Sequence, residues 1–423
     1  MTTPRNAVRE RRPLGANFTR LFVAATLSST GDGVTFVAAP LLAASLTHDP
    51  RLVAGIETAV AAPWLLLSLP AGALVDRWDR RRVMWTVDAM RTVVVAAIAL
   101  AAATHTATLP LLYVAFFLLG CGQVFFDNAD QAMLPTILDG DDLERANARL
   151  QAGTLGAGQL LGPALGSLLF AAAVALPFGF DAATFAVSAL LITRLRGTFV
   201  ARRTSPEGSE NAPPRLRSDI AEGLRWLVGH RLLRTLALVL GAMNLLDLMA
   251  RSTFVLFAQQ RLGLGALGFG LVMTMFAIGG VVGGIATDRW SGRLPDRVLA
   301  VVVAVMGLGY VVVPLTENAA VTAVAFLGAG AASVVWNVVT VSARQQIIPA
   351  PLFARVNSVY RLLAWGSMPV GAALGGVVAH RFGLGAPFWV AAVGHVGLVL
   401  VAAHSLRRRD IDAARGAAAV SPQ

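Results

Sequence analysis

Apolar stretches long enough to cross a membrane dominate this sequence of 423 residues. A helix rises about 1.5 Å per residue, so roughly 20 apolar residues in a row span the hydrocarbon core of a bilayer. About twelve stretches of roughly 18 or more residues with few charges meet this requirement. They are centred near residues 32, 64, 93, 122, 160, 186, 246, 276, 304, 334, 367 and 395. A soluble fold would need a very large core to bury them, so we expect an all-α integral membrane protein with twelve transmembrane helices.

The basic residues fall mainly on one side of this predicted membrane. If the stretches alternate across the bilayer with the N-terminus inside, most arginines lie in cytoplasmic segments. These segments are residues 5–20, 77–82, 194–234, 289–297 and 407–415. Positive charge favours the cytoplasmic side, so we expect both termini there. The net charge of +11 then reflects membrane topology, and we expect no nucleic-acid partner.

A polar stretch in the middle of the chain separates two groups of six apolar stretches. Its first part is rich in proline and charge, whereas its second part, residues 216–227, has apolar side chains at helical spacing. We expect the second part to form an amphipathic helix along the inner membrane surface. The expected organisation is a cytoplasmic segment (1–17), a six-helix bundle (18–196), a cytoplasmic linker (197–230), a second six-helix bundle (231–406) and a cytoplasmic tail (407–423).

The chain repeats itself at the ends of its apolar stretches. The segment from Gly72 to Arg82 reads GALVDRWDRRR, and the segment from Gly284 to Arg293 reads GIATDRWSGR. A second echo pairs the QAMLP that begins at Gln131 with a later QIIP. Repeats with the same orientation in both halves predict a pseudo-two-fold axis along the membrane normal, as in transporters built from two bundles.

With these repeats the chain resembles the major facilitator superfamily, and within it the twelve-helix bacterial drug and siderophore exporters of the macrolide-efflux and enterobactin-exporter type. The likeness extends over nearly the whole chain. The family's loop between helices two and three reads GxLADRxGRR. Asp79 replaces the glycine of this pattern, and the positions that fit it are Gly72, Leu74, Asp76, Arg77, Arg80 and Arg81. The resemblance implies an inner gate whose acids and arginines pair across the two bundles when the transporter faces outward. A role as a positive anchor alone is the alternative. The residues expected at this gate are Gly72, Asp76, Arg77, Arg80, Asp130, Gly284, Asp288 and Arg289.

The fifth stretch carries a second motif, GQLLGPALGS, which begins at Gly158. It is similar to the antiporter motif of exporters, GxxxGPxxGG, with Ser167 in place of the last glycine. Gly158, Gly162 and Gly166 are four residues apart and allow another helix to approach closely, while Pro163 removes one backbone donor. The resemblance implies export rather than uptake, and common small-residue packing is the alternative.

Asp32 is the acidic residue that lies deepest in the first stretch. At 1.5 Å per residue it is roughly 18 Å from the inner end of the helix, near the middle of the bilayer. Gly31 and Gly33 flank it, and we expect them to expose the backbone as a helix break facing the substrate would. Two interpretations remain open: Asp32 couples proton entry to substrate exit, or it is a structural carboxyl hydrogen-bonded to a neighbouring helix.

Other ionisable and polar residues lie within the predicted helices. Asp247 and Arg251 are four apart and share a helix face, which predicts an ion pair in or near the substrate cavity. Asp88 and Arg91 are interpreted in the same way, as a structural pair. We expect further polar groups to line the cavity or to bond between helices, and two acids to lie in water at the outer ends of their helices. The polar groups are Gln123 and Asn337, and the two acids are Glu57 and Asp181.

These features together predict a secondary active transporter in the cell membrane. The first hypothesis is proton-coupled efflux of hydrophobic small molecules such as drugs, by alternating access of two bundles around a central cavity. An importer or facilitator of a metabolite, or a siderophore exporter, on the same fold is the alternative. The chain has one cysteine, scattered histidines and no lysine for a nucleotide-binding loop, so we expect no enzyme activity, no metal and no cofactor. The expected partners are a small-molecule substrate, protons and lipid, and the expected state is a monomer.

Overall fold

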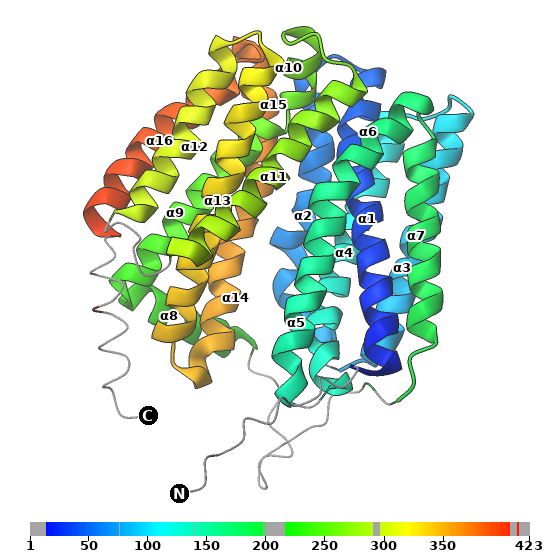
Figure 1. The fold of residues 1–423 in the computed structure, drawn as a ribbon, viewed down its shortest axis with the longest axis vertical. Helices are drawn as coiled ribbons and strands as arrows, with labels where there is room; N and C mark the ends of the chain where they lie inside the picture. Colours follow the sequence, from blue (N-terminus) through cyan, green and yellow to red (C-terminus); the bar gives the residue numbers. More distant parts are fainter. Residues whose placement is uncertain are drawn as a thin grey trace, which may run out of the picture.

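A computed structural model of the chain contains two bundles of helices that stand side by side (Figure 1). It describes residues 14–75, 77–138, 140–197, 216–290 and 297–406, together with the single residues 199 and 413. Within these residues, 12 helices are long and apolar enough to cross a membrane. Each of the twelve centres predicted from hydropathy lies inside one of these spans, so the prediction of an all-α membrane fold is confirmed.

The first bundle holds the first six spans. They are α1 (Gly15–Leu46), α2 (Pro50–Val75), α3 (Arg80–Ala103), α4 (Leu109–Ile137), a fifth span made of α5 (Gly140–Leu155), the π-helix η1 (Gly156–Leu161) and α6 (Gly162–Ala172), and α7 (Leu176–Thr193). The π-helix directly precedes α6, whose second residue, Pro163, has no N–H to donate. The fifth span is therefore interrupted in the middle of its antiporter-type motif.

The second bundle repeats this arrangement. Its first span is made of α9 (Arg231–Arg251) and α10 (Phe254–Gln260). The next three spans are α11 (Ala266–Trp290), α12 (Val298–Leu315) and α13 (Ala319–Ile347). The fifth is made of α14 (Ala350–Gly366) and α15 (Met368–Phe382), and the sixth is α16 (Ala386–Ser405). The break between α14 and α15 precedes Pro369, in the same place as the break before Pro163 in the first bundle.

Close glycine contacts show the same symmetry. In the first bundle, a Cβ built on Gly166 of α6 would be 2.5 Å from the carbonyl oxygen of Val34 in α1. In the second bundle, a Cβ built on Gly375 of α15 would be 2.7 Å from the hydroxyl of Ser252, just after α9. Glycine therefore permits the fifth span to lie against the first, and the eleventh against the seventh.

The two bundles contact each other at one end of the molecule and separate at the other (Figure 1). The contact joins α2 to α15, where a Cβ on Gly376 would be 2.8 Å from the Cα of Arg51, and α6 to α11. We call this the closed end. The opposite end, where α1 begins and α16 ends, is the open end.

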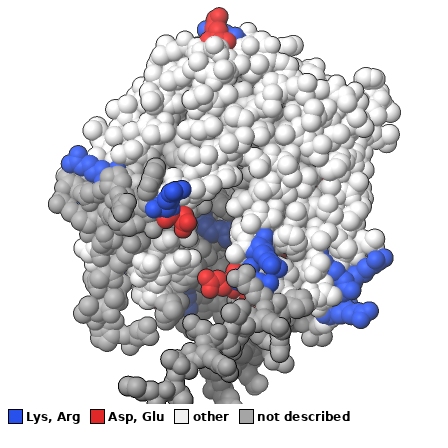
Figure 2. All heavy atoms as spheres, in the orientation of Figure 1, with Lys and Arg blue, Asp and Glu red and all other residues white. Residues whose placement is uncertain are grey.

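Figure 2 shows a hollow between the bundles in the lower part of the visible face, toward the open end. Charged side chains gather around that lower part, whereas the described surface above it is uncharged except at the upper rim. A wide uncharged belt of this kind is the surface that a bilayer would cover.

The helix α8 (Leu216–Gly229) lies between the two bundles in sequence and packs on α14. A Cβ on Gly223 would be 2.6 Å from the carbonyl oxygen of Arg355, and Arg355 Nη1 lies 2.5 Å from Glu222 Oε2. Leu227 is buried, but Leu224, another of the apolar side chains at helical spacing in residues 216–227, is 44% exposed. Leu224 is exposed because α14 contacts α8 on the side of Gly223.

Candidate transport site

A cavity of about 240 Å³ lies within the first bundle, lined by residues of α1, α2, α3, α4 and α7. Its wall combines aromatic and aliphatic side chains with a few carboxylates and one guanidinium. The acidic and basic residues are Asp32, Glu57, Asp181 and Arg91, and the aromatic ones are Phe36, Trp64, Phe116 and Phe185. A mostly apolar cavity with few polar groups is typical of sites for small organic molecules.

Asp32 borders this cavity from an unbroken α1. The predicted helix break at Gly31 and Gly33 is wrong, because both glycines instead make room for neighbouring chains. A Cβ on Gly33 would be 2.8 Å from the carbonyl carbon of Gly158 in η1, and one on Gly31 would be 3.1 Å from Cγ of Asp181 in α7. The backbone on both sides of Asp32 is thus held against other helices.

Asp181 is 1% exposed, so the expectation that it lies in water is wrong. Thr35 Oγ1 of α1 donates a hydrogen bond of 2.5 Å to Asp181 Oδ2. Thr184 lies one turn further along α7, with its hydroxyl 3.4 Å from Asp181 Oδ1. The space left by Gly31 lets this carboxyl enter the bundle, where it meets Thr35 on the same face of α1.

Arg91 links three helices of the first bundle and is 1% exposed. It lies 3.8 Å from Asp88, as the spacing of three residues predicts. Its Nη2 donates a hydrogen bond of 2.7 Å to Gln123 Oε1 in α4, and Gln123 Nε2 donates one of 2.7 Å to Asp127. The Asp88 carboxylate in turn accepts a hydrogen bond of 2.6 Å from Ser188 in α7. A continuous polar network therefore crosses the bundle beside the cavity.

Sequence reasoning singled out Gln123 as a cavity residue but missed its connection to Asp127. These two residues are four apart on α4 and share a helix face, and this spacing could have predicted their hydrogen bond. The guanidinium of Arg91 also lies between two rings, 5.3 Å from that of Phe126 and 5.2 Å from that of Phe185. Rings on both sides hold the cation in place.

Arg251 in α9 connects the two bundles. Its guanidinium lies 3.8 Å from Asp247, as predicted, and also 3.8 Å from Glu57 in α2. It is 5.0 Å from the ring of Phe36 in α1. Tyr310 of α12 donates a hydrogen bond of 2.8 Å to Asp247. One arginine of the second bundle is therefore shared between carboxylates of both bundles.

Asn337, which the sequence placed at the cavity, is exposed on α13 and is not among the residues that line it.

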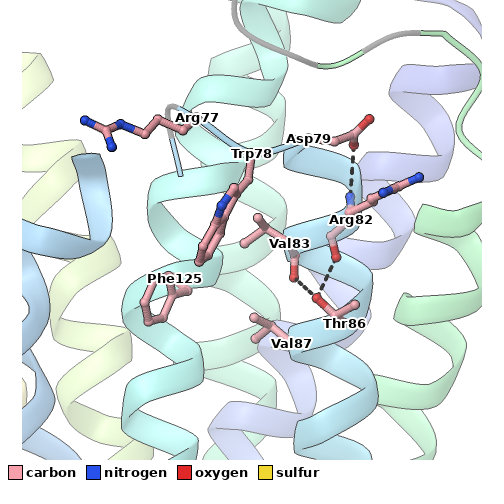
Figure 3. Close-up of a pocket in the computed structure, with 8 residues that line it drawn as sticks. All are labelled: Arg77, Trp78, Asp79, Arg82, Val83, Thr86, Val87 and Phe125. Carbon is pink, nitrogen blue, oxygen red and sulfur yellow. Dashed lines mark hydrogen bonds between the residues drawn. The ribbon is translucent and has the colours of Figure 1, made fainter. Parts of the chain in front are cut away.

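The loop before α3 contains the first copy of the repeated motif. Asp76 lies outside the described residues. Asp79, which departs from the family pattern, caps α3 by accepting a hydrogen bond of 3.0 Å from the backbone N–H of Arg82 (Figure 3). Trp78 stacks on Phe125 of α4, with ring centroids 6.3 Å apart. In Figure 3, Arg77 points away from these residues.

The expected partners at the inner gate are not brought together in this arrangement. Within the described residues, neither Arg77 nor Arg80 lies within 4.0 Å of a carboxylate oxygen. Asp130 has one carboxylate oxygen buried without a hydrogen-bond partner, and Asp288 and Arg289 are exposed near the end of α11. The bundles are apart at this end, so the predicted pairs stay predictions.

The two glycines of the repeated motif are not sites of tight packing. A Cβ on Gly72 would lie 3.6 Å from Asn128 Oδ1, and one on Gly284 would lie 3.7 Å from Cγ1 of Val334. Both distances are ordinary van der Waals contacts.

The antiporter-type motif packs directly against α1. A Cβ on Gly162 would be 2.6 Å from Cα of Gly33, and one on Gly158 would be 3.0 Å from the carbonyl oxygen of Ser29. Ser167, which replaces the family glycine, is buried where α6 meets α11 of the other bundle, and Gly270 leaves the space that it occupies. The motif therefore connects the helix of Asp32 to the contact between the bundles.

The fold and cavity define a membrane transporter built from two six-span bundles. The family described as transmembrane secretion effector matches residues 12–421. The chain belongs to this family, within the major facilitator superfamily.

Two curated relatives match along almost their whole length. The multidrug efflux pump Tap of Mycobacterium tuberculosis (strain ATCC 25618 / H37Rv) is 31% identical over 419 residues, which are 94% of this chain and 95% of the relative. The pump of the same name from Mycolicibacterium fortuitum is 29% identical over 411 residues, or 93% and 97% of the two chains.

Two solved structures share the fold. A bacterial homologue of the iron transporter ferroportin, in an inward-facing state, has a TM-score of 0.73 at 14% identity and covers 92% of this chain and 98% of its own. The nucleoside transporter NupG has a TM-score of 0.71 at 12% identity and covers 93% and 99%. The protein is therefore a multi-pass transporter of the cell membrane with a small-molecule substrate, and its family and relatives are transporters rather than enzymes.

Proposed function

We propose that this protein exports hydrophobic small molecules in exchange for protons, by alternating access. The observation that carries the proposal is the position of Asp32, a carboxyl at mid-membrane depth on the wall of a mainly aromatic cavity. An ionisable group in such a place is costly unless it has a function. Similarity to the multidrug efflux pumps named Tap supports the direction of transport.

The proposed cycle starts from the arrangement described above, with the open end facing the cytoplasm. The excess of arginines at that end supports this orientation. A substrate enters the cavity while Asp32 is ionised, and the bundles then rock so that the closed end opens. A proton from outside neutralises Asp32 and favours release of the substrate. Return to the first arrangement delivers the proton to the cytoplasm.

Rocking requires that contacts at the closed end break. The contact of Arg251 with Glu57 is one of them, and Arg251 keeps Asp247 as a partner within its own helix when it leaves Glu57. The loss of one ion pair is thus partly offset, because the cation never lacks a carboxylate. At the other end, closure brings the two copies of the repeated motif together, and there we place the pairing of Asp76, Arg77 and Arg80 of the first copy with Asp288 and Arg289 of the second.

Everted membrane vesicles test the coupling. We expect accumulation of a lipophilic dye when a pH gradient, acidic inside, is imposed, and loss of accumulation when an ionophore collapses the gradient. Asp32→Asn should abolish pH-driven accumulation. Asp142→Asn is the matched control, because Asp142 is a surface carboxylate near Arg145 with 46% of its side chain exposed. Uptake that ignores the gradient, or full coupled transport by Asp32→Asn, would show that the coupling proposal is wrong.

The direction of transport is tested separately. A strain without the gene should accumulate more dye or antibiotic than its parent. No difference over a broad panel would instead favour the importer or facilitator.

A further inference from the structure

Charges inside the membrane are divided unequally between the two bundles. The first bundle holds five aspartates on α1, α3, α4 and α7, together with Arg91. They are Asp32, Asp88, Asp127, Asp130 and Asp181. In the second bundle, α13 and α14 carry Arg344 and Arg361 instead. The part of the second bundle formed by α13 and α14 therefore carries positive charge.

Arg361 lies where the two bundles meet beside the cavity. It is eleven residues along α14, about 16 Å from the start of that helix. Its guanidinium is 4.7 Å from the ring of Trp365 and 5.8 Å from that of Trp64 in the first bundle. The two tryptophan rings pack edge to face with centroids 4.5 Å apart, and Trp64 lines the cavity. Arg361 is thus held by aromatic rings at the edge of the cavity.

Arg344 stands near it on α13 and is also held by its own bundle. Its guanidinium lies 4.0 Å from the ring of Tyr360, and its Nη1 donates a hydrogen bond of 3.0 Å to Asn357. Arg344 Nε and the hydroxyl of Tyr360 are both buried without a hydrogen-bond partner, although Tyr360 is only 1% exposed. Tyr360 directly precedes Arg361 on α14, so the two arginines belong to the same region of the second bundle.

Two like charges and an unpaired hydroxyl in one region favour the binding of an anion. In the part of the chain that the structure describes, no carboxylate oxygen lies within 4.0 Å of either guanidinium. Buried donors without acceptors cost free energy, and neighbouring cations repel each other. Both costs are relieved if an anion binds here, and arginine is the side chain best suited to hold a planar carboxylate.

We propose that Arg344, Tyr360 and Arg361 bind an acidic group of the exported molecule. The apolar part of the same molecule then occupies the aromatic cavity that Trp64 borders. This inference rests on the proposed export function and deepens it. The first bundle exchanges protons through its carboxylates, and the second bundle recognises a carboxylate or a similar planar anion on the substrate.

The competing explanation is a gate without substrate recognition. A carboxylate of the first bundle such as Asp127, on α4, is the candidate partner for the arginines in that case. If the arginines serve only to attract Asp127 when the open end closes, their loss should impair every substrate equally, whatever its charge.

A matched pair of dyes separates these explanations. Rhodamine B has a free carboxyl group and is a zwitterion, whereas its ethyl ester has an uncharged ester in that place and is a cation. We expect the purified full-length protein to bind the acid more tightly than the ester, by roughly tenfold or more, as measured by fluorescence anisotropy. Arg344→Gln and Arg361→Gln should each weaken binding of the acid by about tenfold and leave binding of the ester unchanged. Arg361→Lys, which keeps the charge but not the planar donor pair, should give an intermediate loss.

The ester also serves as a test of folding, since a variant that binds it normally has an intact cavity. Arg381→Gln is the control for loss of a positive charge in the second bundle, because Arg381 is exposed at the end of α15. It should change neither affinity.

Three results would overturn the inference. The first is that the parent protein binds the ester as tightly as the acid, or binds neither dye. The second is that the arginine variants lose affinity for both dyes equally, and the third is that Asp127→Asn has the same effect as Arg361→Gln. Transport in everted vesicles distinguishes this failure from failure of the proposed function. If the ester is exported with the pH gradient but the acid is not preferred, the anion site alone is wrong. If neither dye is bound or exported, the export proposal is contradicted as well.

Discussion

A methyl group added at Gly162 is expected to push the first span away from the fifth. The new Cβ would be 2.6 Å from Cα and 2.7 Å from the carbonyl carbon of Gly33. Carbon atoms in contact are normally about 3.5–4.0 Å apart, so the helices must separate by roughly 1 Å. Overpacking of this kind costs about 1–3 kcal/mol, and the upper part of that range applies because both clashing atoms belong to backbone. Gly162→Ala should therefore lower the free energy of unfolding and slow transport.

Gly156→Ala is the matched control for this substitution. Gly156 lies in the same span, and a Cβ there would meet no atom within 4 Å. Because alanine favours a helix over glycine by about 1 kcal/mol, this variant should be as stable as the parent or more stable. Unfolding of both variants in mixed micelles with increasing SDS, followed by circular dichroism, measures the difference. The packing argument fails if Gly162→Ala unfolds at the same SDS fraction as Gly156→Ala.

Three further outcomes are expected. Asp79→Ala should destabilise the protein by about 1 kcal/mol in the same SDS titration, because the helix cap is lost. Asp79→Gly, which restores the family residue, should lower the stability by only about a few tenths of a kcal/mol; equal losses for the two variants would contradict the capping role. Gly376→Ala should lower the free energy of unfolding by about 1–3 kcal/mol in the same titration, because its Cβ would lie 2.8 Å from Cα of Arg51 in the other bundle; an unchanged SDS fraction at the midpoint would contradict a tight contact at the closed end. Hydrogen bonds from Arg51 lower the pKa of Asp49 to about 2, so its contribution to stability should be lost as the pH falls from the ordinary aspartate pKa of about 4 toward 2. Because His380 Nδ1 lies 3.4 Å from Asp49 Oδ1, Asp49→Asn and its parent are compared in a His380→Gln background; a difference that stays unchanged down to about pH 2 would contradict this assignment.

The twelve spans were predictable because hydrophobic length is a property of the sequence alone. The repeat also predicted two related bundles, and the structure repeats its helix breaks before Pro163 and Pro369. The π-helix in the fifth span was not predicted. It depends on how η1 contacts α1 at Gly158, a contact between residues more than 120 positions apart. The pattern within one segment holds no information about such a contact.

The candidate site was predictable in part, because contacts within one helix follow from sequence spacing and contacts between helices do not. Pairs within one helix, such as Asp88 with Arg91, follow from spacing and were found. Asp181 was misplaced because its burial depends on Gly31 of another helix. Arg361 was missed because it has no carboxylate three or four residues away on its own helix to mark it.

The edge-to-face pair of Trp64 and Trp365 gives the molecule a natural optical reporter. One ring belongs to each bundle, and their centroids are 4.5 Å apart in the arrangement that is open at the end where the chain begins. Rocking of one bundle against the other changes that distance and therefore the emission of both rings. Among the 8 tryptophans of the chain, this pair alone needs to be kept while the others are replaced by phenylalanine. The alternation of the two states can then be followed in real time in the unlabelled protein, in lipid and during turnover.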